Sequence, residues 1–352
     1  MPDYRRNPIT GHWVIIATDR AKRPETFAAS ATAEEPESLH QKVPEHVDNC
    51  PFCLGNESMT PPEIIAWREG DSPDTHSPDA PGWEVRVVPN KFPAVAPEGE
   101  PELSERGRLY QEMPGYGMHE VLVETPRHDH HPGDIPLEHM RKVIDAYYQR
   151  YHELAQNKKL KSVNIFRNHK KEAGASIEHP HTQLVALPFI PPGSSEELEG
   201  AHQFYLAEGE CPYCAMLEAE IQSGERVIFA NDDFVVFIPY AARLPFETWV
   251  VPRRHRSSFL QIDDHERESF ARAMTEILGR MTTLLDDPPY NYYLHSAPLH
   301  IPALPYYHWH VEIFPKLTTV AGFEMGTRVY INVTIPEESA EYLQKIKGNV
   351  YA

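Results

Sequence analysis

Apolar residues recur along the chain in two helical patterns, each set between segments in which apolar and polar residues alternate. In both patterns the apolar positions are three or four residues apart, which places them on one face of a helix. The first set is Met140, Val143, Ile144, Tyr147, Tyr148, Tyr151, Leu154 and Ala155, and the second is Phe270, Met274, Ile277, Leu278, Met281, Leu284 and Leu285. We therefore expect two long amphipathic helices, each buried along one face.

The segments around these helices are typical of strands, and they follow the same order in both halves of the chain. Each half has a strand, an Asn and a second strand, and then a strand that ends in His. The helix follows, and after it come a further strand and a last one that begins His-x-His. The first-half segments are 83–95, 119–128, 163–166 and 179–188, and their counterparts are 226–239, 245–255, 290–294 and 308–315.

Histidine spacing supports a duplication, because His128 and His179 lie 51 residues apart and His255 and His308 lie 53 apart. Short strands and helices can resemble one another by chance. Four chemically specific positions that repeat in order make chance a poor explanation. The sequence therefore predicts a tandem duplication of an α+β unit.

The boundary between the two units is predicted near residues 188–200, whose Pro, Gly and Ser content is typical of a linker. The predicted domains are 1–195 and 196–352. The first unit is longer because of a Pro- and Gly-rich stretch, residues 61–117, which we expect to form loops and edge strands.

Composition limits the class of protein. The chain has 352 residues, enough for two domains, and its 33 basic and 52 acidic residues give a net charge of −19. Such a charge disfavours nucleic acid as a partner. The sequence has no apolar run of membrane-spanning length and no apolar signal region at its N-terminus. We therefore expect a cytoplasmic protein without a membrane partner.

The cysteines form two matched pairs, Cys50-x-x-Cys53 and Cys211-x-x-Cys214. Disulfides are improbable in a large chain without a signal peptide. Thioredoxin-like redox chemistry is an alternative for one such pair. Two matched pairs favour two metal sites instead.

Each half combines its cysteine pair with the strand-end histidine and with the first histidine of His-x-His. The predicted ligands are Cys50, Cys53, His128 and His179 in one site and Cys211, Cys214, His255 and His308 in the other. Zinc suits this mixture of thiolate and imidazole, and a closed shell of four ligands is typical of a structural site. Ordinary surface histidines are the alternative reading. His130 and His131 could replace His128, which we favour because it matches His255.

Within the stretch EHPHTQ, a zinc ligand at His179 would leave His181 free on the same side of the strand. Imidazole is nucleophilic when neutral, and its phosphoramidate transfers readily. Pro180 stiffens the connection, and Gln183 faces the same side, where it could donate a hydrogen bond to an oxyanion. We therefore predict His181 as a nucleophile and Gln183 as its catalytic partner.

A donor-rich segment, residues 166–176, precedes this stretch and contains Asn168, Gly174 and Ser176. Such segments allow close backbone approach to phosphate oxygens. A second segment, residues 19–24, carries Arg20, Lys22 and Arg23. On composition alone this second segment is better explained as a solvated loop.

The motifs together resemble the galactose-1-phosphate uridylyltransferase family of the branched histidine-triad superfamily, over nearly the whole chain. The matching segments are RAKRP, VVPNKFP, FRNHKKEAGASIEHPHTQ and AGFEMG. The resemblance implies an α+β fold of two tandem histidine-triad-like repeats, each an antiparallel sheet with packed helices. It also implies His181 as nucleophile, Gln183 as its partner and substrate contacts at Arg20, Arg23, Asn90, Asn168, Gly174, Ser176, Phe323 and Glu324.

What the resemblance implies for function is nucleotidyl transfer between a nucleotide sugar and a sugar 1-phosphate. The expected reaction converts UDP-glucose and galactose 1-phosphate into glucose 1-phosphate and UDP-galactose through a uridylyl-histidine. Two structural Zn2+ ions and a homodimer that shares its active sites are also implied. The second repeat has Glu312 in place of Gln183, so we expect one reactive histidine per chain.

Two features of the sequence differ from the enterobacterial-type members of this family and widen the range of expected substrates. Thr318 occupies a place where the family's enterobacterial-type members carry lysine, and the second cysteine pair resembles a dual-zinc branch. That branch includes a plant ADP-glucose phosphorylase. The alternatives are therefore an ADP-glucose phosphorylase or adenylyltransferase, and a non-catalytic zinc-containing scaffold that binds nucleotides.

Overall fold

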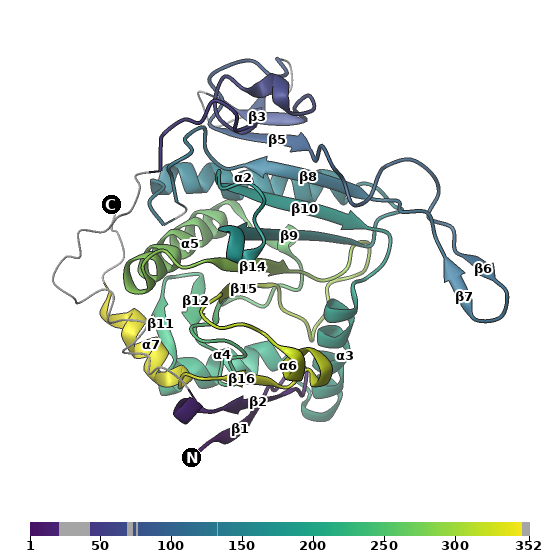
Figure 1. Ribbon diagram of the computed structural model, residues 1–352. Helices are drawn as coiled ribbons and strands as arrows, with labels where there is room; N and C mark the ends of the chain where they lie inside the picture. The colour runs from purple at the N-terminus through teal and green to yellow at the C-terminus, as the bar shows by residue number, and fades with distance from the viewer. Residues whose placement is uncertain (21–42, 69–72, 75–76, 132, 347–352) are drawn as a thin grey trace.

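The computed structural model describes residues 1–20, 43–68, 73–74, 77–131 and 133–346. Within this part of the chain an eleven-stranded sheet runs through the molecule, and all its neighbouring strands are antiparallel (Figure 1). The first half contributes β4 (Pro73–Asp74), β3 (Ile65–Trp67), β5 (Val85–Pro89), β8 (Met118–Val123), β10 (His181–Leu187) and β9 (Ser162–His169). The second half continues with β14 (Tyr290–His295), β15 (His310–Pro315), β13 (Thr248–Pro252), β12 (Phe234–Phe237) and β11 (Val227–Ala230).

Strand order is mirrored about the junction between β9 and β14, which confirms the predicted duplication. Outward from the junction, β10, β8 and β5 follow β9, and β15, β13 and β12 follow β14. The junction pairs Arg167 with Tyr292 and Ile165 with Leu294. The two predicted sheets are thus joined edge to edge, because each would otherwise expose an unpaired strand at this edge.

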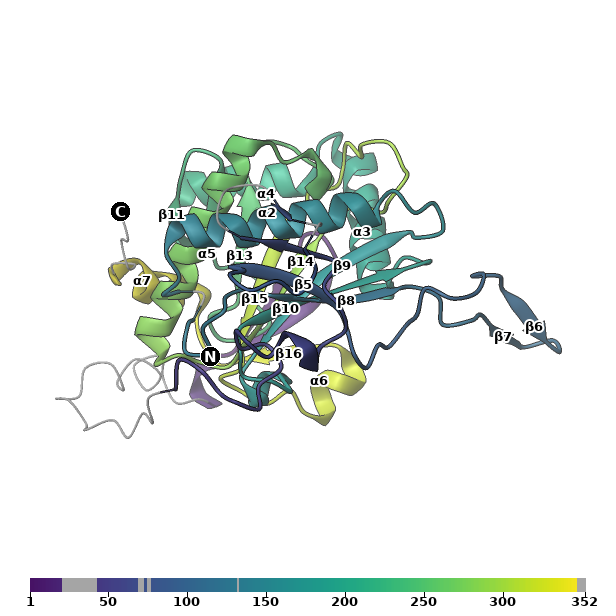
Figure 2. The same ribbon diagram turned by 90° about the horizontal axis from the view of Figure 1, so that it is seen from above.

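One face of the sheet packs on the two predicted amphipathic helices, α2 (Leu137–Leu154) and α5 (Asp264–Leu285), which lie along the same side (Figure 2). Alternate strand residues such as Leu122, Leu184 and Ile165 point into this core. Side chains alternate between faces along a strand, so the residues between them point to the opposite face. That opposite face carries the candidate site.

Helix α3 (Pro192–Glu208) occupies most of the segment that its composition suggested to be a linker. The physical reason is that Pro192 stands at the first helical position, where its missing N–H costs nothing, and helix-forming residues follow. Helix α4 (Pro212–Ser223) comes next, and both helices pack on the opposite face of the second half-sheet. The proposed boundary at residues 195 and 196 falls inside α3 and stays a prediction.

Smaller elements complete the described chain. Strands β1 (Asp3–Arg6) and β2 (Trp13–Ile16) pair with β16 (Tyr330–Asn332), and β6 (Ser104–Arg106) with β7 (Tyr110–Glu112) forms a hairpin that projects from the body (Figure 1). The remaining elements are the helices α6 (Gly322–Thr327) and α7 (Pro336–Lys345) and the short 3-10 turns η1 (Thr18–Arg20), η2 (Glu57–Met59), η3 (Lys171–Ala173) and η4 (Phe259–Gln261). Among the described helices, none combines the length and apolar character needed to cross a bilayer.

Candidate active site

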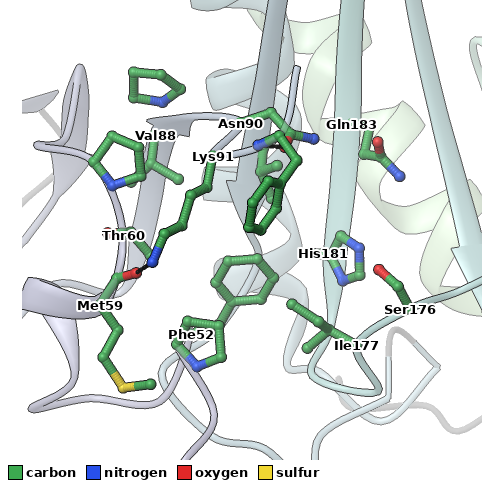
Figure 3. Close-up of a pocket in the computed structure, with 15 residues that line it drawn as sticks. Phe52, Met59, Thr60, Val88, Asn90, Lys91, Ser176, Ile177, His181 and Gln183 are labelled. Carbon is green, nitrogen blue, oxygen red and sulfur yellow. Dashed lines mark hydrogen bonds between the residues drawn. The ribbon is translucent and has the colours of Figure 1, made fainter. Parts of the chain in front are cut away.

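A pocket of about 250 Å³ opens on the face of the first half-sheet away from α2 (Figure 3). His181 and Gln183 on β10 line it together with Val121 on β8 and Val88 on β5. The other lining residues are Pro51, Phe52, Met59, Thr60, Pro61, Pro89, Asn90, Lys91, Phe92, Ser176 and Ile177. The pocket therefore has a mainly apolar wall, with Gln183 and Ser176 beside His181 and with Thr60 and Lys91 near Met59 (Figure 3). Apolar walls with a few polar groups are common in small-molecule sites.

The His181 imidazole is oriented by a backbone carbonyl two residues before it. Its Nδ1 lies 2.7 Å from the His179 carbonyl oxygen, so Nδ1–H donates there and Nε2 keeps a lone pair. Burial lowers the pKa of His181 despite that hydrogen bond. The ring is 6% exposed and packs at 5.3 Å from the Phe52 ring. The side chain is therefore a neutral imidazole with one fixed tautomer, which is the reactive form of a histidine nucleophile.

The donor-rich segment folds into a tight loop beside this histidine. After β9 the backbone turns at Lys170, which has φ +65°, passes through η3 and turns again at Gly174, which has φ +92°. Gly174 is required there because this left-handed conformation strains other residues. Ser176 reaches the pocket next to His181 (Figure 3). Asn168 stands at the start of the loop, and its Oδ1 accepts from Asn291 Nδ2 at 2.8 Å.

Asp287 fastens this loop to the second half of the chain. Its Oδ1 accepts from His169 Nε2 at 2.8 Å, its Oδ2 lies 2.7 Å from Lys170 Nζ, and His131 Nδ1 is 3.8 Å away. Burial would raise the pKa of Asp287, but His169, His131 and Lys170 hold it well below its usual range. For His169 burial acts in the opposite direction and lowers the pKa, so this side chain donates to Asp287 as a neutral imidazole.

The first cysteine pair meets His128 and His179 directly behind the pocket. The four ligand atoms lie within 4.8 Å of one another and all four residues are buried. His179 Nε2–H donates to the Thr125 carbonyl at 2.7 Å, which leaves Nδ1 for a metal, and that Nδ1 lies 3.6 Å from Cys53 Sγ. Burial lowers the pKa of His179 to about 3, so the imidazole is neutral as a metal ligand must be.

A matching group forms from Cys211, Cys214, His255 and His308, again within 4.8 Å. His255 Nε2–H donates to the Leu304 carbonyl at 2.9 Å, so its Nδ1 is left for a metal. In this group His255 is exposed and Cys214 is half-buried, unlike the first. The described residues thus hold two groups with the donor chemistry of Cys2His2 sites, at the predicted positions, and His128 rather than His130 or His131 joins the first.

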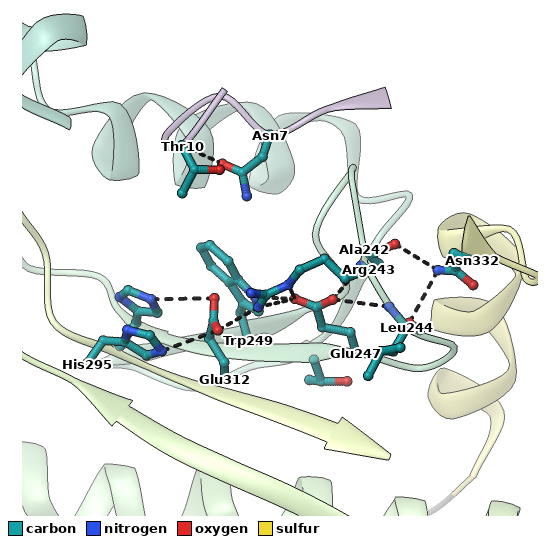
Figure 4. A network of polar contacts seen from close by, with 12 residues as sticks. Asn7, Thr10, Ala242, Arg243, Leu244, Glu247, Trp249, His295, Glu312 and Asn332 are labelled. Carbon is teal, nitrogen blue, oxygen red and sulfur yellow. Dashed lines mark hydrogen bonds and ion pairs between the residues drawn. The ribbon is translucent and has the colours of Figure 1, made fainter. Parts of the chain in front are cut away.

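The corresponding pocket of the second repeat is smaller, about 100 Å³, and Glu312, Arg243, Trp249 and Tyr213 are among its lining residues. His310 Nδ1 lies 3.0 Å from the His308 carbonyl, as in His181, but the ring is fully buried. It is stacked against Trp249 at 4.8 Å and His295 at 4.6 Å. Glu312 accepts from Arg243 at 2.6 Å and lies 3.2 Å from His295 Nε2, so a charged network lies beside the histidine (Figure 4).

Some predicted substrate contacts lie elsewhere. Phe323 and Glu324 are on α6, next to β16, and do not line the pocket of their own chain. In Figure 1 this helix lies across the molecule from β3 and β5. Arg23 lies outside the described residues, and only the backbone of Arg20 is described, at the end of η1.

Three polar residues of the site were missed by sequence reasoning. His119 contacts Gln183, Asn291 contacts Asn168, and Asp287 holds the loop. The alternation of the strand that contains His119 places it on the same side as Val121, which was a usable signal. Asn291 and Asp287 come from the second repeat, and no local pattern links them to the loop.

A duplicated antiparallel α+β fold, with His181 facing a pocket beside the donor-rich loop at residues 170–176, is the architecture of a histidine-triad-like nucleotidyltransferase. Family models agree: residues 1–191 match galactose-1-phosphate uridyl transferase, N-terminal domain, and residues 162–348 match its C-terminal domain. The chain belongs to the galactose-1-phosphate uridyl transferase family. This family acts on nucleotide sugars and sugar phosphates.

Relatives of this chain include enzymes with two different activities. The chain is 33% identical to an ADP-glucose phosphorylase of Arabidopsis thaliana, covering 98% of this chain and 93% of the relative. It is 28% identical to the galactose-1-phosphate uridylyltransferase of Thermotoga maritima, covering 99% and 100%. A crystal structure of the Arabidopsis phosphorylase with bound ADP-glucose superposes with a TM-score of 0.80 at 32% identity, over 99% and 100% of the two chains. A structure of a uridylyltransferase superposes with a TM-score of 0.72 at 29% identity, over 98% of this chain and 97% of the other.

Replacing Asp287 by Asn should loosen the loop without straining the backbone, because Asn tolerates the left-handed φ of +49° at this position. We expect a loss of about 1–3 kcal/mol in the free energy of unfolding. A depressed carboxyl pKa stabilises the fold above its unfolded value near pH 4, and the contribution disappears as the pH falls. The difference from wild type should therefore be full above about pH 5 and vanish in acid.

Urea unfolding at several pH values measures this difference, and hydrogen exchange should rise in residues 170–176. The exposed Asp232→Asn variant, with the same chemical change, is the control. A difference from wild type that did not vary with pH would show that the Asp287 carboxylate is not held by His169 and Lys170.

Proposed function

We propose that the protein is a UDP-glucose–hexose-1-phosphate uridylyltransferase that forms a uridylyl-histidine on His181. The observation that carries this proposal is the His181 imidazole, whose Nδ1 is fixed on the His179 carbonyl while the ring faces a pocket that Gln183 and Ser176 also line. Membership of the family, with both of its domain models matched, supports the choice of galactose 1-phosphate as acceptor.

In the first half-reaction, His181 Nε2 attacks the α-phosphorus of UDP-glucose. A P–N bond forms, the P–O bond to the β-phosphate breaks, and glucose 1-phosphate leaves with that oxygen. The His179 carbonyl stabilises the positive charge that develops on the imidazole through its bond to Nδ1–H. In the second half-reaction a phosphate oxygen of galactose 1-phosphate attacks the same phosphorus and the P–N bond breaks, which releases UDP-galactose.

Stabilising the equatorial phosphoryl oxygens is the main task left to the protein. Gln183 and Ser176 line the pocket, and Asn168 stands at the entry to the Gly174 loop. We assign these residues to the phosphates, together with Arg20 and Arg23 from the N-terminal segment. Asn90, beside the apolar wall, is assigned to the nucleoside.

We further propose that zinc occupies both Cys2His2 groups. Cys50, Cys53, His128 and His179 would hold one ion, and Cys211, Cys214, His255 and His308 the other. When bound, zinc supplies structural cross-linking, because a shell of four protein ligands leaves no site for substrate. The hydrogen bonds from His179 to Thr125 and from His255 to Leu304 support this assignment, since such bonds orient metal-binding histidines.

A second candidate is an ADP-glucose phosphorylase. The 33% identity and the TM-score of 0.80 with the Arabidopsis enzyme favour it. The first half-reaction would then place adenylyl on His181, and inorganic phosphate would be the attacking nucleophile in the second, giving ADP. The two candidates share the covalent step and differ in base and acceptor.

We also propose a homodimer in which α6 of one copy completes the pocket of the other. Phe323 and Met325 are 48% and 75% exposed on this helix, which suits apolar side chains that meet a partner. Phe323 and Glu324 would then contact the sugar from the second copy, since they do not reach the pocket of their own chain.

Mass spectrometry of enzyme quenched after mixing with UDP-glucose alone should find a uridylyl group on the peptide that contains His181. His181→Gly should fold, keep its metal and carry no adduct. His310→Phe, which removes the corresponding imidazole of the second repeat but fills its buried space, should still form the adduct. An adenylyl adduct from ADP-glucose in place of the uridylyl adduct would favour the phosphorylase. No adduct from either donor, in wild-type enzyme, would favour a non-catalytic scaffold.

Elemental analysis should find two zinc ions per chain, and Cys50→Ser should retain about one. The loss of a structural zinc should lower the unfolding temperature of Cys50→Ser by roughly 5–10 °C, together with activity. Cys214→Ser should also lose one ion but leave the His181 strand in place. A reproducible content of one ion in wild-type protein contradicts the two-site assignment.

Mixing inactive copies tests the shared site. Each site needs His181 from one copy and Phe323 from the other, so a dimer of His181→Gly with Phe323→Ala contains one fully wild-type site. Random exchange should restore about a quarter of wild-type activity, because half of the dimers are mixed and each has one working site. A monomer by sedimentation, or no restoration after exchange is verified, would rule out this arrangement.

A further inference from the structure

Three polar side chains on or beside neighbouring strands form a row at the pocket: Asn90 and Gln183 line it, and His119 stands between them just outside the lining. His119 is the second residue of β8, and the register places Val121 opposite Gln183 and His119 opposite Val185. His119 is thus diagonal to Gln183 on one face of the sheet, within reach of a long side chain. On its other side the Asn90 N–H donates to the His119 carbonyl at 2.9 Å.

Hydrogen bonding fixes the tautomer of His119. The Ala94 backbone N–H donates to His119 Nδ1 at 3.1 Å, so Nδ1 is an acceptor and carries no proton. A neutral imidazole has its one proton on the other nitrogen, and Nε2–H is therefore a donor. Gln183 Oε1 lies 2.9 Å from that Nε2 and accepts the bond.

Asn90 does not compete for this proton. Its Oδ1 already accepts from the Phe92 N–H at 2.9 Å, which fixes the orientation of the amide. Its Nδ2 lies 3.0 Å from His119 Nε2 and is a donor, so it cannot accept from Nε2–H. It could donate to Nε2 only in the other tautomer, whose protonated Nδ1 would face the Ala94 N–H. Of the two side-chain amides near His119 Nε2–H, only that of Gln183 therefore offers an oxygen acceptor.

The bond decides which end of the Gln183 amide faces the reaction. With Oε1 turned to His119, the NH2 group is the end left for the pocket. An oxyanion on phosphorus needs a donor, and a flipped amide would present an oxygen and repel it. A glutamine without a partner would sample both orientations, since its two ends differ little in size.

We infer that His119 is a positioning residue that locks Gln183 with its amide NH2 toward the transferring phosphoryl group. His119 does not line the pocket, so it acts through Gln183 and not on the substrate. The inference rests on the proposed transfer to His181. It assigns a role to a residue that contacts neither the nucleotide nor the reacting phosphorus.

Two conservative variants separate this role from simple anchoring of the loop at Ala94. His119→Asn keeps an oxygen acceptor near the position of Nδ1 and loses the donor that reaches Gln183. His119→Gln places an amide N–H near the position of Nε2 and so keeps a donor for Gln183. If only the loop anchor matters, Asn should substitute well. If the role of His119 is to orient Gln183, the His119→Gln variant should substitute well instead.

Single-turnover formation of nucleotidyl-His181, with UDP-glucose and ADP-glucose each tested as donor, is the measurement. We expect His119→Asn to slow it about 10- to 100-fold, the scale of a misplaced catalytic group, with the donor Kd changed less than about threefold. His119→Gln should stay within about threefold of wild type. His119→Asn should add little in a Gln183→Leu background, because the two residues act as one unit. His152→Phe, on the outer side of α2, controls for histidine loss.

Equal slowing by Asn and Gln at position 119 would overturn the inference, as would full additivity with Gln183→Leu. A change confined to donor Kd would also overturn it. These results leave the covalent mechanism intact, because wild-type enzyme would still form the adduct. Absence of the adduct in wild-type enzyme overturns the proposed function instead, and His119 would then have no transfer to assist.

Discussion

The register of β10 is the constraint on which the candidate site depends. This strand is paired on both edges, with β8 and with β9, so it cannot slide without breaking two ladders. A shift by one residue would turn His181 into the helix-facing core and Leu184 into the pocket. His179 lies two residues before β10 begins, so the metal group holds the segment that leads directly into the strand of the nucleophile.

Beneath that strand, on the helix side, a buried polar cluster contains an ion pair of the first repeat and a tyrosine pair that joins the two repeats. Arg167 on β9 and Glu124 after β8 are paired and nearly fully buried, and Glu124 also accepts from Thr182 on β10. Tyr147 of α2 bonds Tyr292 of β14 and lies 2.6 Å from Thr182 Oγ1. Burial opposes the charge on Arg167, but Glu124 raises its pKa above the usual value. Such a pair costs desolvation and so fixes geometry more than it stabilises; here it fixes the strand that presents His181.

Local patterns predicted the elements, and repeated chemistry predicted which residues meet. The helix faces of α2 and α5 follow from apolar spacing, and both Cys2His2 groups follow from matched positions in the two halves. The helical start of α3 was missed because Pro, Gly and Ser suit both a linker and a helix N-terminus. Contacts between repeats could not be derived, since they depend on the β9–β14 junction. Asp287 and Asn291 reach the donor-rich loop after β9 only through that pairing.

Comparison of the two repeats shows what makes one His-x-His strand suitable for phosphoryl chemistry. Both second histidines donate from Nδ1 to a backbone carbonyl, so the tautomer alone does not distinguish them. The difference lies two residues on, where Gln183 is neutral and Glu312 is anionic, since Arg243 and His295 keep its pKa low despite burial. A carboxylate there would repel phosphate oxygens. The pocket beside it is also smaller, about 100 Å³ against 250 Å³, and the Arg243 on its wall is already paired with Glu312. Burial would lower the pKa of His295, but Glu197 and Glu312 raise it to about 10, so the anions and cations of this network neutralise one another. The second repeat has therefore kept the fold and its Cys2His2 group while replacing the features that would let it hold a phosphate.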